Sequence, residues 1–210
     1  GDPEPKATLR TMVQKARDAS VPIDTIDKAV KRGSGQLEGV RYEPINYEGY
    51  APCGVALYVE TLSDNRNRTG AEVRNIFSKN GGSIAEPGAV AWQFARKGSI
   101  LLPKAAGPED DVMLQILEAG AEDLVDLGTS WQVITSASDL HAVRVALEEA
   151  DVPVESSDLV MQAAQTVPLD AEGDVRKVLH LIEALDDHDD VQSVWANFDA
   201  TDDVLDLATS

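Results

Sequence analysis

The 210-residue sequence has little of what disulfides, metal centres and membrane helices require. Its single cysteine excludes an intrachain disulfide, and its three scattered histidines leave little material for a zinc site. Its longest apolar runs, such as residues 99–103, are far shorter than the roughly 20 residues of a membrane-spanning helix. We therefore expect no membrane partner, no metal, and a reducing cytoplasmic setting.

Catalytic motifs are missing as well. The sequence contains no Walker loop, no G-x-S-x-G, no H-E-x-x-H and no glycine-rich fingerprint between a strand and a helix. Asn80-Gly81-Gly82 follows a helical stretch and fits a helix stop. Cys53 lies in a Pro-Cys-Gly turn with no histidine nearby in sequence, which favours a buried or turn cysteine over a nucleophile. We expect no enzymatic activity and no cofactor.

The charge is distributed unevenly along the chain, although the composition is ordinary for a globular protein at 43% hydrophobic and 26% charged. Residues 1–36 carry 7 basic and 5 acidic side chains, and residues 37–105 carry 8 and 7. Residues 106–210 carry 3 and 25, so the second half has a net charge of −22 and the first half one of +3. Two interpretations stay open: the halves serve different partners, or the acidic residues only keep the protein in solution.

Residues 5–33 predict two short amphipathic helices separated at Val21-Pro22. Their apolar residues recur at helical spacing, at Leu9, Met12, Val13 and Ala16 and then at Ile23, Ile26 and Val30. Two helices this short bury too little apolar surface to fold alone. Because the chain also begins without methionine, we expect a further segment upstream.

The rest of the chain predicts an α+β fold. Alternating apolar residues after residue 41 indicate a β-hairpin with its turn in residues 49–54. Residues 90–94 predict a strand that turns at Lys97-Gly98, and residues 103–108 predict a linker. Helical spacing recurs over residues 71–80, 113–117, 140–150 and 175–185, and strand patterns over residues 99–102, 124–127, 131–134, 158–164 and 191–198.

The densest polar stretch is Ser63–Thr69, between a predicted strand and a predicted helix. Its two arginines, Arg66 and Arg68, stand near the free N–H groups of a helix start and could bind phosphates or an RNA edge. In the alternative, Asp64 or Thr69 caps the helix and the arginines pair with acidic neighbours. A second polar run, residues 186–190, lacks the spacing of a calcium loop and predicts a solvated acidic loop.

Short motifs follow one another in a specific order along the chain. They are residues 47–56 (YEGYAPCGVA), 61–69 (TLSDNRNRT), 72–74 (EVR), 79–82 (KNGG) and 94–98 (FARKG), with further pieces at 15–17, 29–35 and 191–198. Together they resemble the YebC family of bacterial proteins, whose mitochondrial relatives act as translational activators of a cytochrome oxidase subunit. The resemblance spans nearly the whole chain.

The resemblance implies a three-domain α+β protein without enzymatic activity. Residues 1–38 would be the last part of a helical domain, whose Lys-rich beginning is absent here. Residues 39–105 and 166–210 would form a discontinuous middle domain, and residues 106–165 an acidic domain. The family implies either a DNA-binding transcriptional regulator or a ribosome-associated translation factor that binds ribosomal RNA. No helix-turn-helix pattern is visible, and the sequence does not choose between DNA and RNA.

We expect nucleic acid to bind the basic first half. The acidic domain is expected to avoid nucleic acid and to face solvent, the ribosome or a basic protein. We expect a monomer. The candidate nucleic-acid-binding residues are Lys15, Arg17, Lys28, Lys31, Arg32, Arg66, Arg68, Arg74 and Lys79.

Overall fold

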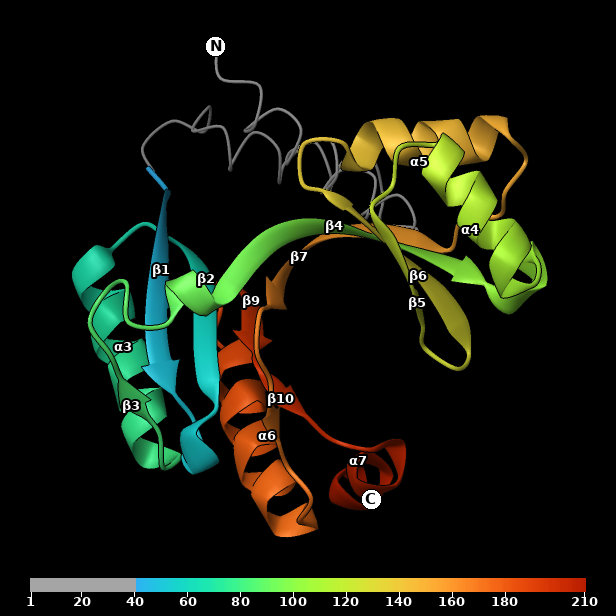
Figure 1. Ribbon diagram of the computed structural model, residues 1–210. Helices are drawn as coiled ribbons and strands as arrows, with labels where there is room; N and C mark the ends of the chain where they lie inside the picture. Colours follow the sequence, from blue (N-terminus) through green and yellow to red (C-terminus); the bar gives the residue numbers. More distant parts are fainter. Residues whose placement is uncertain (1–40) are drawn as a thin grey trace. The chain divides into compact units, whose positions relative to one another are not determined.

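The computed structural model describes residues 41–210, which have the predicted α+β architecture with antiparallel sheets (Figure 1). The helices expected within residues 5–33 lie outside the described residues. None of the helices in residues 41–210 has the length and apolar character needed to cross a membrane. The described chain divides into two compact units, which we call the discontinuous unit (residues 41–95 and 163–210) and the continuous unit (residues 96–162).

The discontinuous unit is built on a four-stranded sheet in the order β3-β1-β2-β9. Strands β1 (Glu43–Tyr50) and β2 (Ala56–Ser63) form the predicted antiparallel hairpin, joined through η1 (Pro52–Gly54). The edge strands are β3 (Ser83–Ile84) and β9 (Val191–Ala196).

Helices α3 (Arg66–Lys79) and α6 (Glu172–Asp186) pack against this sheet. The side chains that bury the interface include Leu57, Val59, Val73, Phe77, Val175, Val178 and Leu181. A parallel pair, β8 (Val167–Pro168) with β10 (Phe198–Asp199), and helix α7 (Asp202–Thr209) complete the unit. Helix α7 packs on α6 and did not stand out in the sequence pattern.

The continuous unit has its own four-stranded sheet in the order β5-β6-β4-β7. Its strands are β4 (Phe94–Pro103), β5 (Asp123–Asp126), β6 (Ser130–Ser136) and β7 (Ser156–Ala163). Helices α4 (Glu109–Glu118) and α5 (Leu140–Glu149) contribute to its core. That core contains Ile100, Leu102, Ile116, Val133, Leu140 and Leu147.

The chain between β3 and α4 differs from the prediction. Residues Ala91–Gln93 form the 3-10 helix η2 instead of a strand, and β4 runs without a turn through Lys97-Gly98. Gly98 is needed for close packing, because a Cβ there would lie 2.1 Å from Thr135 Oγ1. The expected linker is also wrong: its residues include η3 (Lys104–Ala106), which leads from β4 into α4 within the continuous unit. The structure divides the chain after residue 95, because β4 pairs with β6 over Lys97–Pro103.

Candidate nucleic-acid interface

Helix α3 begins in the polar stretch that the sequence singled out. Asn65 is its N-cap: the Asn65 backbone is extended and its Oδ1 accepts the amide of Arg68 at 3.1 Å. The expectation that Asp64 or Thr69 caps the helix is therefore wrong. Thr69 is fully buried in the first turn, where its hydroxyl accepts from Ser63 Oγ at 2.6 Å. Side chains before and inside the helix thus fix where α3 starts.

The acidic run after α6 folds back onto this helix start. Asp190 Oδ2 accepts hydrogen bonds from the Thr69 hydroxyl at 2.6 Å and from Arg68 Nη2 at 2.7 Å. Burial by itself would raise the pKa of Asp190, but these two donors outweigh it and the pKa lies below its ordinary value. Arg68 also contacts Asp64 at 3.0 Å and Glu72 at 3.9 Å. The alternative in which the arginines pair with acidic neighbours therefore holds for Arg68 in three contacts, and for Arg66 in one longer contact with Glu43.

His188 joins the same cluster. Its Nδ1 accepts the amide of Asp190 at 3.1 Å, so in the neutral ring the proton is on Nε2, which lies 2.6 Å from Glu72 Oε2. The His188 and Asp190 side chains are each only 13% exposed. The expectation of a solvated loop is therefore wrong for these two residues, because they contact α3.

Glu72, His188 and Asp190 have donor atoms within 4.8 Å of one another, a spacing that a metal ion could use. A metal on His188 Nε2 would require the ring proton on Nδ1, where it would face the N–H of Asp190. The guanidinium of Arg68 already supplies positive charge to Asp190 and Glu72. The residues therefore suit an ion-pair cluster better than a metal centre.

The other candidate cations of α3 are exposed. Arg66 is 67% exposed and has one long contact, from its Nε to Glu43 at 3.4 Å. Within residues 41–210, neither Arg74 nor Lys79 forms an ion pair. Arg66 and Arg74 lie about 80° apart around the helix axis, and Lys79 lies about 140° further round. A single strand of phosphates along α3 would therefore reach Arg66 and Arg74 together, and Lys79 from another side.

The remaining candidates, Lys15, Arg17, Lys28, Lys31 and Arg32, lie outside the described residues. The charge contrast between the two sequence halves is not a contrast between the two described units. Because residues 163–210 fold with residues 41–95, the discontinuous unit carries 7 basic and 18 acidic side chains. The continuous unit carries 4 and 13. Positive charge in the described chain is therefore local, and α3 is where it is most concentrated.

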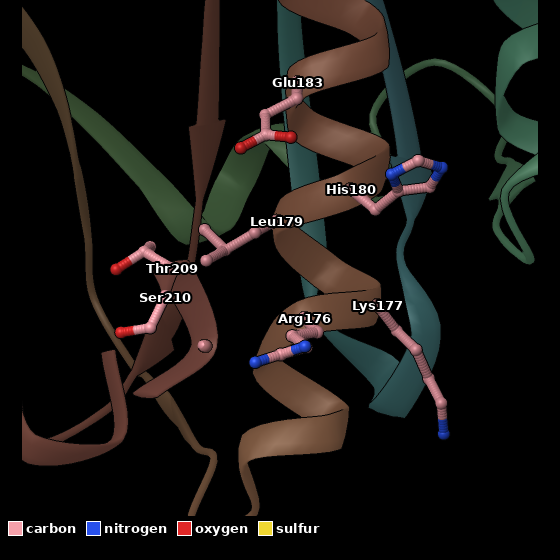
Figure 2. A pocket seen from close by; sticks show the side chains of 8 residues that line it. Arg176, Lys177, Leu179, His180, Glu183, Thr209 and Ser210 are labelled. Atoms are coloured by element: carbon pink, nitrogen blue, oxygen red, sulfur yellow. The ribbon is translucent and has the colours of Figure 1, made fainter. Parts of the chain in front are cut away.

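A groove of about 570 Å³ lies between α6 and α7, and no sequence pattern indicated it because α7 was not predicted (Figure 2). Figure 2 shows Leu179 and Glu183 directed toward Thr209 and Ser210, whereas Lys177 points away. Arg176 Nη2 donates to the carbonyl of Leu207 at 2.9 Å and pairs with Glu172 at 2.7 Å. Arg176 therefore links α7 to α6. Since its guanidinium is occupied and Lys177 points away, the groove does not present a cluster of free cations.

The described chain matches a known family over most of its length. The model of the TACO1/YebC second and third domain matches residues 42–198. The chain belongs to the TACO1/YebC family. The matched residues include α3, its cap and the acidic run that contacts it, and they end before α7.

Relatives in this family share about half of their residues with the chain. A "probable transcriptional regulatory protein" from Parafrankia sp. (strain EAN1pec) is 51% identical over 100% of this chain and 84% of its own length. Proteins with the same description from Halothermothrix orenii and Mycolicibacterium smegmatis are 48% and 52% identical, over 100% and 97% of this chain and 83% and 81% of their own lengths. The crystal structure of a conserved hypothetical protein from Aquifex aeolicus has a TM-score of 0.80 at 39% identity, covering 92% of this chain and 79% of that protein.

Proposed function

We propose that this protein is a non-enzymatic, nucleic-acid-binding regulator of gene expression. The description of its relatives as probable transcriptional regulatory proteins supports the regulatory class. The observation that carries nucleic-acid binding is the exposure of Arg66 and Arg74 on a helix whose start is held by an internal cap. Guanidinium groups on such a rigid element suit phosphate, because each can donate two parallel hydrogen bonds.

Arg68 has a different role in this proposal. Its guanidinium is occupied by Asp64 and Asp190, which contact it at 3.0 and 2.7 Å. The hydrogen bonds to Asp190 and Asp64 raise the pKa of Arg68 and hold its guanidinium in place. We assign Arg68 to positioning α3, and Arg66, Arg74 and Lys79 to binding, together with the cations of residues 15–32.

The absence of enzymatic activity is part of the same proposal. Cys53 is an exposed turn residue with a positive φ of 67°. Partial desolvation of its thiol, and then the negative charge of Asp174, raise the pKa of that thiol. A raised pKa leaves less thiolate at neutral pH and so a weaker nucleophile.

The relatives' description supports transcriptional regulation, and we propose DNA as the nucleic acid through which it acts. A second candidate is binding of ribosomal RNA at the ribosome, and the order of helices and strands in residues 41–210 favours it. Within residues 41–210 no α-helix is directly followed by another, so this part contains no helix-turn-helix to enter a major groove. In either form, we propose that the local negative charge of the continuous unit, such as the three acidic residues in the first turn of α4, keeps its surface there away from phosphates and facing solvent or a basic partner.

The first test is a salt titration of binding to a fluorescent oligonucleotide. Replacing Arg66 and Arg74 with alanine should weaken binding and reduce the slope of log affinity against log salt by roughly 0.7 to 0.9 for each phosphate that is no longer neutralised. Lys177→Ala, which removes another exposed cation of the same unit, is the matched control and should change neither. An unchanged slope in the double variant would contradict the assignment of α3.

The second test chooses the target. Crosslinking of the protein in cells, followed by sequencing of the recovered nucleic acid, should return promoter DNA for a transcription factor and ribosomal RNA for a translation factor. Recovery of neither above the level of an uncrosslinked control would argue against both forms.

A further inference from the structure

The segment between β3 and β4 holds a tryptophan out into solvent. Trp92, in η2, is 74% exposed, more than any other large hydrophobic side chain of the described residues. The other two tryptophans differ: Trp131 is buried and Trp195 is partly buried. An exposed side chain of this size is informative when its backbone is held in place, because exposure is then built into the fold.

The backbone around Trp92 is held by a buried carboxylate. Glu48, in β1, is only 7% exposed, and its two oxygens accept the amides of Gly88 at 2.6 Å, Val90 at 2.9 Å and Ala91 at 2.6 Å. Burial alone would raise the pKa of Glu48, but the three amides outweigh it and the pKa is lowered. Val90 is completely buried. The segment therefore enters η2 along a defined path.

The chain leaving η2 is held as well. The carbonyl of Gln93 accepts the amide of Ala164 at 2.8 Å, and the Gln93 side chain accepts from Asn197 Nδ2 at 3.2 Å. The next residue, Phe94, is 8% exposed, with its ring 6.2 Å from that of Tyr58. Trp92 is thus the one exposed residue between two anchored neighbours, which fixes its position before any ligand arrives.

The indole ring of Trp92 is suited to binding a flat, apolar group. Trp92 Nε1 donates to the carbonyl of Ala89 at 2.9 Å, so its only polar atom is already satisfied. The residues before it in this segment are small or compact, namely Pro87, Gly88, Ala89 and Ala91. The exposed surface is therefore mostly apolar indole ring, and the residues just before it in the sequence add no other large exposed apolar side chain.

We propose that Trp92 is a stacking platform for one unpaired base of a single-stranded nucleic acid. This inference rests on the proposed function and names the form of nucleic acid that would bind. A base has a π-face of similar size and needs no hydrogen bond from the ring, and such stacking tolerates any sequence. A protein partner would need water-excluding contacts around the tryptophan, which side chains as small as these do not offer. Bases inside a duplex are stacked on one another, so a paired ligand would not present one.

Arg66 and the segment that carries Trp92 are bound to opposite faces of β1. Arg66 contacts Glu43 at one end of this strand, and the segment leading to Trp92 is bound to Glu48, five residues along. At about 3.3 Å per residue, these points are roughly 17 Å apart along the strand. Because side chains five residues apart on a strand point to opposite faces, a ligand stacked on Trp92 does not continue directly to Arg66.

The test uses the full chain with fluorescein-labelled oligouridylate, oligoadenylate and a matched RNA duplex. Trp92→Leu should weaken binding of both single strands by about 5- to 150-fold, the loss of one stacked base, and leave the weaker duplex binding unchanged. Trp92→Phe, which keeps an aromatic face, should retain most of the affinity. Leu207→Ala, which removes another exposed apolar side chain of the unit, is the matched control.

Indole emission gives a second readout, since stacking should quench Trp92 in the wild-type protein and this signal should vanish in Trp92→Phe. The proposal is overturned if single strands bind the wild-type protein but Trp92→Leu binds them equally well, while binding still depends on Arg66 and Arg74. If the wild-type protein binds no nucleic acid at all, the proposed function fails first and the stacking role fails with it. A crosslink from Trp92 to a protein in cells, without one to nucleic acid, would replace stacking with protein docking.

Discussion

Arg68 and Asp190 are 122 residues apart in the sequence, yet Arg68 Nη2 donates to Asp190 Oδ2 across 2.7 Å. This pair joins the first turn of α3 to the end of the loop that follows α6. It also divides the arginines of the polar stretch by role, because Arg68, although 43% exposed, is paired with Asp64 and Asp190, whereas Arg66 is 67% exposed and has one longer contact.

Removing the carboxylate of Asp190 should destabilise the fold. Asp190→Ala leaves the Thr69 hydroxyl and the Arg68 guanidinium without their common acceptor, at a cost of about 1–3 kcal/mol in the free energy of unfolding. Urea denaturation of the wild-type and variant proteins measures this difference. Asp189→Ala, in an exposed neighbour, is the control and should cost little. Equal losses in the two variants would contradict a specific role for Asp190.

The N-cap of α3, Asn65, should contribute more to the free energy of unfolding than the nearby Asn67. Asn65→Ala removes the acceptor of the Arg68 amide and should lower the free energy of unfolding by about 0.5–2 kcal/mol. Asn67→Ala, two residues later on the exposed side of the same turn, removes no cap and should be nearly neutral. Thermal unfolding followed by circular dichroism compares the two, and a neutral Asn65→Ala would show that the cap is dispensable.

Replacing Glu48 should weaken the protein in a way that depends on pH. Glu48→Gln puts an uncharged amide where a carboxylate accepts three N–H groups, which should cost about 1–3 kcal/mol at neutral pH. The folded-state pKa lies below the ordinary value of 4.5, so the carboxylate's contribution is complete above 4.5 and is lost as pH falls through the folded pKa. The difference between the wild-type protein and Glu48→Gln should therefore shrink in acid, as measured by denaturation across this range. A difference that grows in acid would contradict the assignment.

Two glycines should respond to alanine in opposite directions. In Gly98→Ala the new Cβ would meet Thr135 Oγ1 at 2.1 Å and Leu140 at 2.9 Å, so we expect a loss of about 1–3 kcal/mol. In Gly173→Ala, within α6, the new Cβ meets nothing within 4 Å, so we expect a gain of about 0.5–1 kcal/mol. Melting temperatures of the two variants are sufficient to test this. A stable Gly98→Ala would mean that β4 and β6 can separate locally without cost.

Neutralising the acidic start of α4 should increase non-specific binding of nucleic acid, if the continuous unit repels phosphates as we propose. The variant Glu109→Gln, Asp110→Asn, Asp111→Asn removes three negative charges from the first turn. Its affinity for oligonucleotides should rise at low salt and approach the wild-type value at high salt, because salt screens the repulsion. Affinities that match the wild type at every salt concentration would contradict the repulsion. The melting temperature should be checked in parallel, since acidic residues at a helix start also stabilise the helix.

The sequence by itself determined most of the local structure. Alternation of apolar residues was sufficient for the β1–β2 hairpin, short apolar stretches for β5 and β6, and the stripe from Val175 to Leu185 for α6. These patterns work because one face of each element is buried and the other is not. The family resemblance was likewise carried by contiguous motifs. Because the polar residues at the start of α3 are also contiguous, the sequence identified them as a candidate binding site without any knowledge of their surroundings.

The tertiary structure decided what those polar residues contact. Nothing local to Ser63–Thr69 indicates that Asp190 binds Arg68 and Thr69, because the partners come from a segment about 120 residues away. The same holds for Glu48, whose carboxylate turns residues predicted as a strand into η2 and leaves Trp92 exposed, and for Gly98, whose need for space comes from β6. Periodicity reports which side of an element is buried, whereas ion pairs, buried acceptors and close backbone packing depend on which elements the fold brings together.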